Sequence, residues 1–423
     1  MDWSITDYVY LSVCTSLTLS CSCLFFLILF WLIVRTRAGG VKSSQAESEV
    51  SVGFFHPYCN AGGGGERVLW SAVKVTQTRY PVVKIVVYTG DTEAAPDMIL
   101  AKARDRFNMN ISDRNLSFVY LHKRRFVEAQ YYPHFTMLGQ SLGSLVLGVE
   151  ALLSFVPSIY IDTMGYSATL PLFKYCGGCL VGCYVHYPTI STDMLDQVQS
   201  KRAAYNNRGF IAGSPLASFV KLRYYKIFAW LYSQCGGVAD TVMVNSSWTE
   251  EHIRQLWGGG GEGGVVKVFP PCDTSHLANI TREKLEEAGE VRILSLGQFR
   301  PEKDHVLQIK AMFELRQILP EKDWERTKLV IIGGCRGQDD WKLLQDLKDL
   351  SKHFSVEDNV TFLPNLPFSD LLSEFGKATV GIHTMWNEHF GIGDSLFVNL
   401  WSITTFNTRN CGDDGGRLDD NRS

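Results

Sequence analysis

Four short segments of this chain carry residue types suited to binding an anion or moving a proton. They are the glycines Gly62, Gly63, Gly64 and Gly65, the histidine His186, the basic pair Arg300 and Lys303, and the segment holding Glu388, Gly391 and Gly393. Each of them follows an apolar run of the kind expected of a buried β-strand. Because ligands of parallel α/β sheets bind at the carboxyl ends of the strands, we expect all four segments to lie at such edges.

The glycine run lies between an apolar stretch, 50–55, and a segment with helical spacing, 68–73. Glycine permits positive φ and a close approach of backbone to ligand, and free N–H groups at a helix start favour a phosphate. The spacing matches neither the dinucleotide-binding nor the P-loop pattern, so those two classes are disfavoured. A flexible turn without a ligand is the alternative interpretation.

The basic pair has the chemistry of a diphosphate clamp. The Arg300 guanidinium can make two parallel hydrogen bonds, and the Lys303 ammonium acts as a point charge. The glycines that follow Glu388 could open a helix onto a phosphate. For each segment alone, a buried histidine, a solvated basic turn or a plain loop explains the residues equally well. Their shared position at strand ends favours a functional site.

Composition narrows the class of protein. The chain has 423 residues, 45% of them hydrophobic and 20% charged, enough for two globular domains. A net charge of −3 gives no general attraction to nucleic acid, so none is expected as a partner. Eleven cysteines are too few for a disulfide framework. Cys176, Cys179 and Cys183 raise the alternative of a metal site, but no second pair or suitable histidines accompany them, so no metal is expected.

The N-terminal region predicts a membrane anchor. Residues 8–34 contain no charged side chain and are long enough to span a bilayer. A cleaved signal peptide is the alternative, but the chain starts with acidic rather than basic residues. Arg35 and Arg37 follow the apolar run, so the positive-inside rule places residues 1–7 in the lumen and the rest in the cytosol. The Asn-x-Ser/Thr triplets downstream are then chance occurrences.

Two series of apolar strands and helices follow, as in parallel sheets covered on both faces. The first series predicts a domain over 45–275 and the second a domain over 285–393, with a charged helix at 281–290. The expected strands are 50–55, 82–88, 116–121, 158–161, 180–185 and 241–244, then 293–296, 329–332, 360–363 and 379–383. The main expected helices are 97–106, 135–155, 306–318, 341–353 and 369–375.

Two local signals accompany these elements. Ser247 and Glu250 have the spacing of a helix capping box. In the segment 219–232 basic and aromatic residues alternate along an apolar helix, which is typical of a helix in a membrane interface. Packing of that helix against the sheet is the alternative.

Long stretches of the chain resemble the retaining GT-B glycosyltransferases of family 4. The stretches that carry the resemblance are Phe55–Trp70, Tyr184–Ser191, Gly297–His305 and Trp386–Gly393. The resemblance runs from about residue 45 to residue 393. It implies an α/β, GT-B fold of two facing Rossmann-like domains behind the N-terminal transmembrane helix, with 45–275 as the acceptor-side domain and 285–393 as the donor-binding domain.

The resemblance also implies an activity: transfer of the fourth and fifth mannoses, in α-1,2 linkage, from GDP-mannose to a dolichol-diphosphate-linked Man3GlcNAc2. The implied location is the cytosolic face of the endoplasmic reticulum membrane, with other mannosyltransferases of the pathway as possible partners. No metal or other cofactor is implied.

The site roles come from the resemblance as well. Gly62 to Gly65 border the catalytic cleft, and His186 lies beside the transferred sugar. Arg300 and Lys303 hold the donor diphosphate, Glu388 lies by the donor mannose, and Gly391 and Gly393 contact the donor.

The sequence departs from the family pattern in two places. Gln298 stands where many relatives have arginine, although Arg300 is close by. After Gly393 the pattern ends: Leu396 replaces a second glutamate, and 394–423 form a divergent tail. We therefore expect the second domain to be truncated. A catalytically inactive, membrane-bound binding partner is the alternative function.

Overall fold

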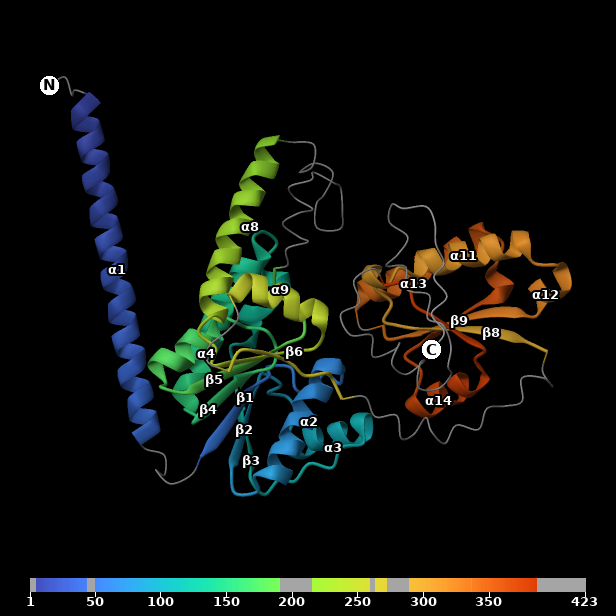
Figure 1. Cartoon of the computed structure of the whole chain (residues 1–423), viewed down its shortest axis with the longest axis horizontal. Helices are drawn as coiled ribbons and strands as arrows, with labels where there is room; N and C mark the ends of the chain where they lie inside the picture. Colours follow the sequence, from blue (N-terminus) through green and yellow to red (C-terminus); the bar gives the residue numbers. More distant parts are fainter. Residues whose placement is uncertain are drawn as a thin grey trace. The chain divides into compact units, whose positions relative to one another are not determined.

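The computed structural model describes residues 5–43, 50–190, 215–258, 263–271, 289–335 and 337–385. The chain divides into two compact units, Met1–Pro271 and Cys272–Ser423 (Figure 1).

A seven-stranded parallel sheet forms the centre of the first unit, with strand order β3-β2-β1-β4-β5-β6-β7. The strands are β1 (Ser51–Phe55), β2 (Lys84–Thr89), β3 (Leu116–Tyr120), β4 (Ile159–Asp162), β5 (Leu180–Val185), β6 (Thr241–Val244) and β7 (Val265–Lys267). The strand order reverses between β1 and β4, which lie side by side. Ligands of doubly wound sheets bind outside the carboxyl ends of the strands at this switch point.

Helices cover both faces of this sheet (Figure 1). The described helices of the first unit are α1 (Ile5–Ser43), α2 (Gly64–Arg79), α3 (Pro96–Phe107), α4 (Thr136–Ser154), α5 (Thr169–Pro171), α8 (Pro215–Gly236) and α9 (Ser247–Trp257), with short turns η1 (Arg124–Val127), η2 (Ala129–Tyr131) and η3 (Leu172–Cys176). Leu69, Trp70 and Val73 of α2 pack on one face, and Leu147 and Leu152 of α4 pack on the other. This confirms the prediction of strands buried on both sides.

The second unit contains a four-stranded parallel sheet with order β10-β9-β8-β11. Its strands are β8 (Val291–Leu296), β9 (Thr327–Gly333), β10 (Val360–Pro364) and β11 (Val380–Ile382). Its helices are α11 (His305–Ile318), α12 (Glu321–Glu325), α13 (Gln338–His353) and α14 (Phe368–Lys377), with turns η4 (Pro301–Lys303) and η5 (Glu357–Asn359). Buried side chains lie on both faces of this sheet. Here the switch point lies between β8 and β11.

The predicted capping box at Ser247 is wrong. The residue that caps α9 is Ser246, whose hydroxyl accepts a hydrogen bond from the Thr249 N–H at 3.2 Å. Glu250 instead pairs with Arg254 at 2.9 Å, one turn further along the helix. From the sequence alone, either of the two adjacent serines could be the residue that caps the helix. The structure identifies Ser246, because its backbone is extended, as is typical of a capping residue.

Several predictions lie outside the described residues. They are most of the charged helix at 281–290, the site residues Glu388, Gly391 and Gly393, and the divergent tail at 394–423.

Helix α1 runs for 39 residues without a break and contains the predicted span at 8–34. At 1.5 Å per residue it is about 58 Å long, against about 30 Å for the hydrocarbon core of a bilayer. Its C-terminal part packs on the first unit: Val34 and Ala38 are buried in the core, and the Lys42 ammonium lies 3.5 Å from the carbonyl oxygens of Gly177 and Gly178.

By length and composition, α4 could also cross a membrane. The buried core helices of soluble proteins meet the same criteria. Because Leu147, Ala151 and Leu152 of α4 are fully buried against the sheet, we interpret α4 as a core helix.

Candidate functional site

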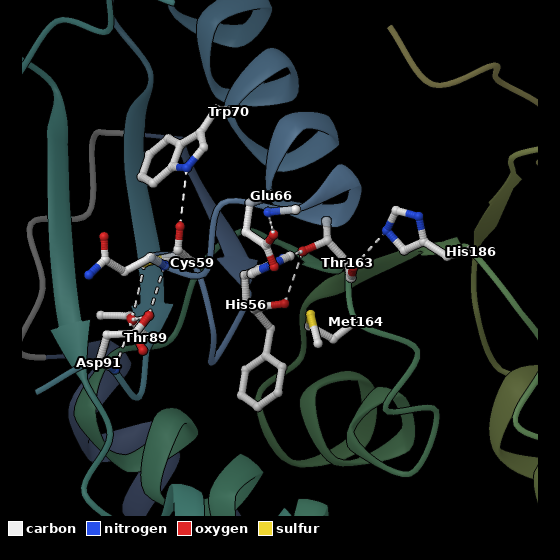
Figure 2. Close-up of polar contacts among 12 residues, drawn as sticks. His56, Cys59, Glu66, Trp70, Thr89, Asp91, Thr163, Met164 and His186 are labelled. Atoms are coloured by element: carbon white, nitrogen blue, oxygen red, sulfur yellow. Dashed lines mark hydrogen bonds and ion pairs between the residues drawn. The ribbon is translucent and has the colours of Figure 1, made fainter. Parts of the chain in front are cut away.

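The switch point of the first sheet brings together three segments that are far apart in the sequence (Figure 2). The loop from His56 to Gly65 follows β1, Thr163 follows β4, and His186 follows β5. The sequence placed the glycine loop and His186 at strand ends, and the structure confirms that position for both. Thr163, which links them, was missed.

A buried histidine forms the centre of this cluster. The His56 ring is fully buried, with Nδ1 2.8 Å from the Thr163 hydroxyl and Nε2 3.4 Å from a carboxylate oxygen of Glu66. The Thr163 hydroxyl also lies 3.1 Å from the Phe55 carbonyl oxygen, to which it can donate. These contacts connect the end of β1, the start of α2 and the end of β4 inside the protein.

Glu66 connects this network to the glycine loop. Its second carboxylate oxygen accepts a hydrogen bond from the Gly63 N–H at the start of α2. Burial works against ionisation of Glu66, but the hydrogen bond and charge of His56 and the Gly63 N–H outweigh it and lower the pKa of the carboxyl below its usual value. Glu66 is therefore a carboxylate, placed at the positive end of α2.

His186 lies against the glycine loop and is held in one orientation. Its Nε2–H donates to the Thr163 carbonyl oxygen at 3.2 Å. A Cβ at Gly65 would lie 3.6 Å from His186 Nε2 and 3.8 Å from His56 Cε1, so the loop passes directly beside both rings. Burial, with the neighbouring His56, lowers the pKa of His186 to about 4. At neutral pH the ring is uncharged, and with its proton on Nε2 it offers Nδ1 as a hydrogen-bond acceptor.

The outer part of the loop is fixed to α2 and to the segments that follow β2 and β3. The Trp70 indole N–H donates to the Cys59 carbonyl oxygen at 3.3 Å, and the Asn60 N–H donates to an Asp91 carboxylate oxygen at 2.8 Å. Asp91 in turn pairs with the guanidinium of Arg124. Gly62 has φ of +83°, a conformation that favours glycine. The loop is therefore a positioned element, which argues against a merely flexible turn.

The basic pair of the second unit lies at the carboxyl end of β8. Lys303 reaches the end of β11: its ammonium is 3.1 Å from the Met385 sulfur, and its carbonyl oxygen accepts a hydrogen bond from the Thr384 hydroxyl at 2.8 Å. This places Lys303 at the switch point, with Met385 three positions before Glu388.

Arg300 has a different environment from Lys303. Its guanidinium lies 4.0 Å from carboxylate oxygens of both Glu302 and Asp340, and its side chain is 41% exposed. Part of its charge is already balanced by these carboxylates. The two cations are therefore not equivalent, although the sequence assigned them one role.

The cysteine cluster has the character of core thiols. Cys179 and Cys183 are buried, and burial raises the pKa of Cys179 to about 12. Among the described residues, no group of three or more His, Cys, Asp or Glu side chains is placed to hold a metal ion.

Comparison with known proteins identifies both halves of the chain. Residues 49–257 match the family described as ALG11 mannosyltransferase N-terminus, and residues 278–393 match the family Glycosyl transferases group 1. The second match ends at the residue where the family pattern ends in the sequence, Gly393.

Curated relatives are identical to this chain at about half of the aligned positions. A Homo sapiens protein named GDP-Man:Man(3)GlcNAc(2)-PP-Dol alpha-1,2-mannosyltransferase is 48% identical over 388 residues, which cover 90% of this chain and 77% of that protein. A Mus musculus protein of the same name is 50% identical over 364 residues, which cover 86% of this chain and 73% of that protein.

Solved structures show the same fold. A sucrose-phosphate synthase from Thermosynechococcus elongatus has a TM-score of 0.55 at 14% identity, covering 85% of this chain and 81% of that one. The OtsA apo structure has a TM-score of 0.56 at 12% identity, and the match covers 84% of this chain and 82% of that one. These likenesses confirm a GT-B glycosyltransferase fold built from two Rossmann-like units. With the sequence matches, they show that this chain belongs to the ALG11 mannosyltransferase family of group 1 glycosyltransferases.

Proposed function

We propose that this chain transfers mannose from GDP-mannose, in α-1,2 linkage, to dolichol-diphosphate-linked Man3GlcNAc2. The supporting observation is the identity of 46–50% to proteins that bear this activity in their names, over most of both chains. The positions of His186, beside the glycine loop at the carboxyl edge of its sheet, and of Lys303, at the switch point of its own sheet, agree with such a reaction.

In this reaction an acceptor hydroxyl oxygen bonds to C1 of the mannose, and the bond from C1 to the donor diphosphate breaks. The hydroxyl proton leaves with the released GDP. Negative charge grows on the diphosphate as that bond breaks, and a fixed cation stabilises it. Lys303 is the residue that we assign to this task, with Arg300 as a weaker, more exposed contributor.

The role that we assign to His186 is to orient the transferred sugar. Its neutral ring presents Nδ1 as an acceptor for a sugar hydroxyl, while Nε2–H is committed to the Thr163 carbonyl. A neutral ring also adds no positive charge beside an anomeric carbon that becomes cationic during transfer. Glu388, Gly391 and Gly393 complete the donor site in this proposal, since the family pattern covers them. No metal or other cofactor takes part, so transfer should persist in excess chelator.

The proposed location is the endoplasmic reticulum membrane, with α1 as a single-pass anchor and the two units on the cytosolic side. The uncharged run at 8–34, followed by Arg35 and Arg37, supports this orientation. Helix α8 supports a second, interfacial contact with the membrane. It buries Tyr225 and Phe228 in the core and leaves Trp230 61% exposed.

A donor-selection assay tests the proposed function. The purified full chain is given lipid-linked Man3GlcNAc2 and, separately, GDP-mannose, GDP-fucose or UDP-glucose. We expect sugar transfer from GDP-mannose alone, with the new linkage cleaved by an α-1,2-mannosidase. Transfer from UDP-glucose instead, or a product that resists this mannosidase, would show that the substrate assignment is wrong.

A further inference from the structure

A small cavity opens in the first unit between the start of α4 and the loops that follow β4 and β5. Its volume is about 140 Å³. Polar groups on its wall come from Gln140, Ser141, Ser167 and Thr189, and apolar groups come from Met137, Met164 and Tyr166. None of the residues assigned above to the site lines this cavity.

The cavity nevertheless adjoins the site through the chain. Met164 directly follows Thr163, and Figure 2 shows Met164 beside Thr163. The carbonyl oxygen of Thr163 accepts the hydrogen bond from His186. Thr189 lies three positions after His186, on the loop that follows β5. The two loops that hold the histidine in place thus also form one wall of the cavity.

The size of the cavity selects the class of ligand. One water needs about 10–15 Å³ of such space, so the cavity holds a ligand of about ten non-hydrogen atoms. A single hexose unit has this size. A nucleoside diphosphate is at least twice as large and would extend beyond the cavity.

The chemistry of the wall also suits a sugar. The hydroxyls of Ser141 and Ser167 have no hydrogen-bond partner among the described residues, and Ser167 is 9% exposed. The Gln140 amide donates to the Val127 carbonyl oxygen at 2.8 Å, which fixes the side chain and leaves its oxygen as an acceptor. Unpaired hydroxyls beside apolar atoms match a hexose, which has hydroxyl groups on its edge and C–H groups on its faces.

We propose that this cavity is a subsite for one mannose unit of the acceptor glycan. The inference rests on the proposed function and adds to it the place where the acceptor is held. In this arrangement the acceptor sugar contacts the loops after β4 and β5, on the same unit as His186. The donor sugar is the competing occupant, and the test separates the two.

The test measures binding of two ligands to the full chain in detergent: the free Man3GlcNAc2 glycan and GDP-mannose. Ser141→Leu fills the cavity from its α4 wall, and Ser154→Leu makes the same change at an exposed position of α4 outside the cavity. We expect Ser141→Leu to weaken glycan binding about tenfold or more, because a larger side chain takes up the ligand volume. Binding of GDP-mannose should change less than about twofold, and Ser154→Leu should leave both affinities unchanged.

Ser141→Ala is the second variant, since it removes the hydroxyl without adding bulk. It should weaken glycan binding about two- to tenfold, as expected for one neutral hydrogen bond, at an unchanged unfolding temperature. Unaltered glycan binding in both Ser141 variants overturns the proposal, as does an effect on GDP-mannose alone. If the glycan binds through the cavity but the wild-type chain transfers no mannose, the subsite stands and the proposed function fails.

Discussion

Replacing Glu66 with glutamine tests whether the buried network controls the reaction from beneath the glycine loop. The change keeps the size of the side chain and removes its charge. In the structure the charged carboxylate accepts a hydrogen bond from the Gly63 N–H. It also faces the Nε2 atom of His56, whose ring is fully buried. Glu66 is buried, so we expect its effect to pass through the Gly63 N–H to the glycine loop, and through His56 and Thr163 to His186.

The structure sets the size of the effect. Hydrogen bonds to charged groups contribute roughly 1.5–3 kcal/mol, and a neutral amide retains about half of that. The remaining loss of about 0.75–1.5 kcal/mol corresponds to a roughly four- to thirteenfold lower kcat. Because the variant alters the orientation of His186 and leaves the donor diphosphate contacts in place, KM for GDP-mannose should stay within about twofold.

The assay is steady-state transfer of mannose to lipid-linked Man3GlcNAc2, at varied GDP-mannose. Glu93→Gln is the matched control, because Glu93 is an exposed carboxylate of the same unit that pairs loosely with Arg124 at 3.8 Å. Glu93→Gln should have the kcat of wild type. The kcat of Glu66→Asp should lie between those of wild type and Glu66→Gln. A folded Glu66→Gln variant with unchanged kcat would refute the link from Glu66 to His186.

Two further predictions follow from the same contacts. Lys303→Ala should lower kcat/KM about a hundredfold or more, and Arg300→Ala by about tenfold or less, because Arg300 is exposed and already paired with Asp340 and Glu302; equal losses in a transfer assay would contradict their different environments. The pKa of His186 is about 4 in the folded chain and 6.5 in the unfolded chain. Between these two pH values the protein takes up a proton at His186 when it unfolds. The free energy of unfolding therefore falls as pH is lowered from 6.5 to 4, by at most about 3 kcal/mol. Burial raises the pKa of Asp162 to about 7, so the contribution of Asp162 to the free energy of unfolding has the opposite pH dependence. The quantity to measure is therefore the difference in thermal unfolding temperature between wild type and His186→Gln across this pH range. A difference that does not change with pH would show that His186 is not held neutral.

Much of the fold could be predicted because apolar periodicity is a local property of the sequence. The run at 82–88 contains Ile85, Val86, Val87 and Tyr88, all fully buried in β2, as the pattern indicates. The start of α9 could not be fixed in the same way, since Ser246 and Ser247 are chemically equivalent and only the backbone distinguishes them.

The site could be predicted only in part, for a physical reason. His186 and Lys303 were found because each follows an apolar strand. His56, Glu66 and Thr163 meet only when β1 and β4 pair, and Thr163 lies more than a hundred residues from Phe55, whose carbonyl it contacts. A threonine after a strand carries no signal of its own. Glu66 three positions after Gly63 was the available clue, since this is the spacing of a carboxylate that caps a helix start.

The most direct test of the whole account is to express this chain in cells that lack the endogenous transferase and to analyse their dolichol-linked oligosaccharides. The account predicts that Man3GlcNAc2 lipid declines and Man5GlcNAc2 lipid appears, and that the Lys303→Ala variant, present at equal level in the membrane fraction, fails to produce this change. Persistence of Man3GlcNAc2 lipid with the wild-type chain, or equal rescue by Lys303→Ala, would contradict it.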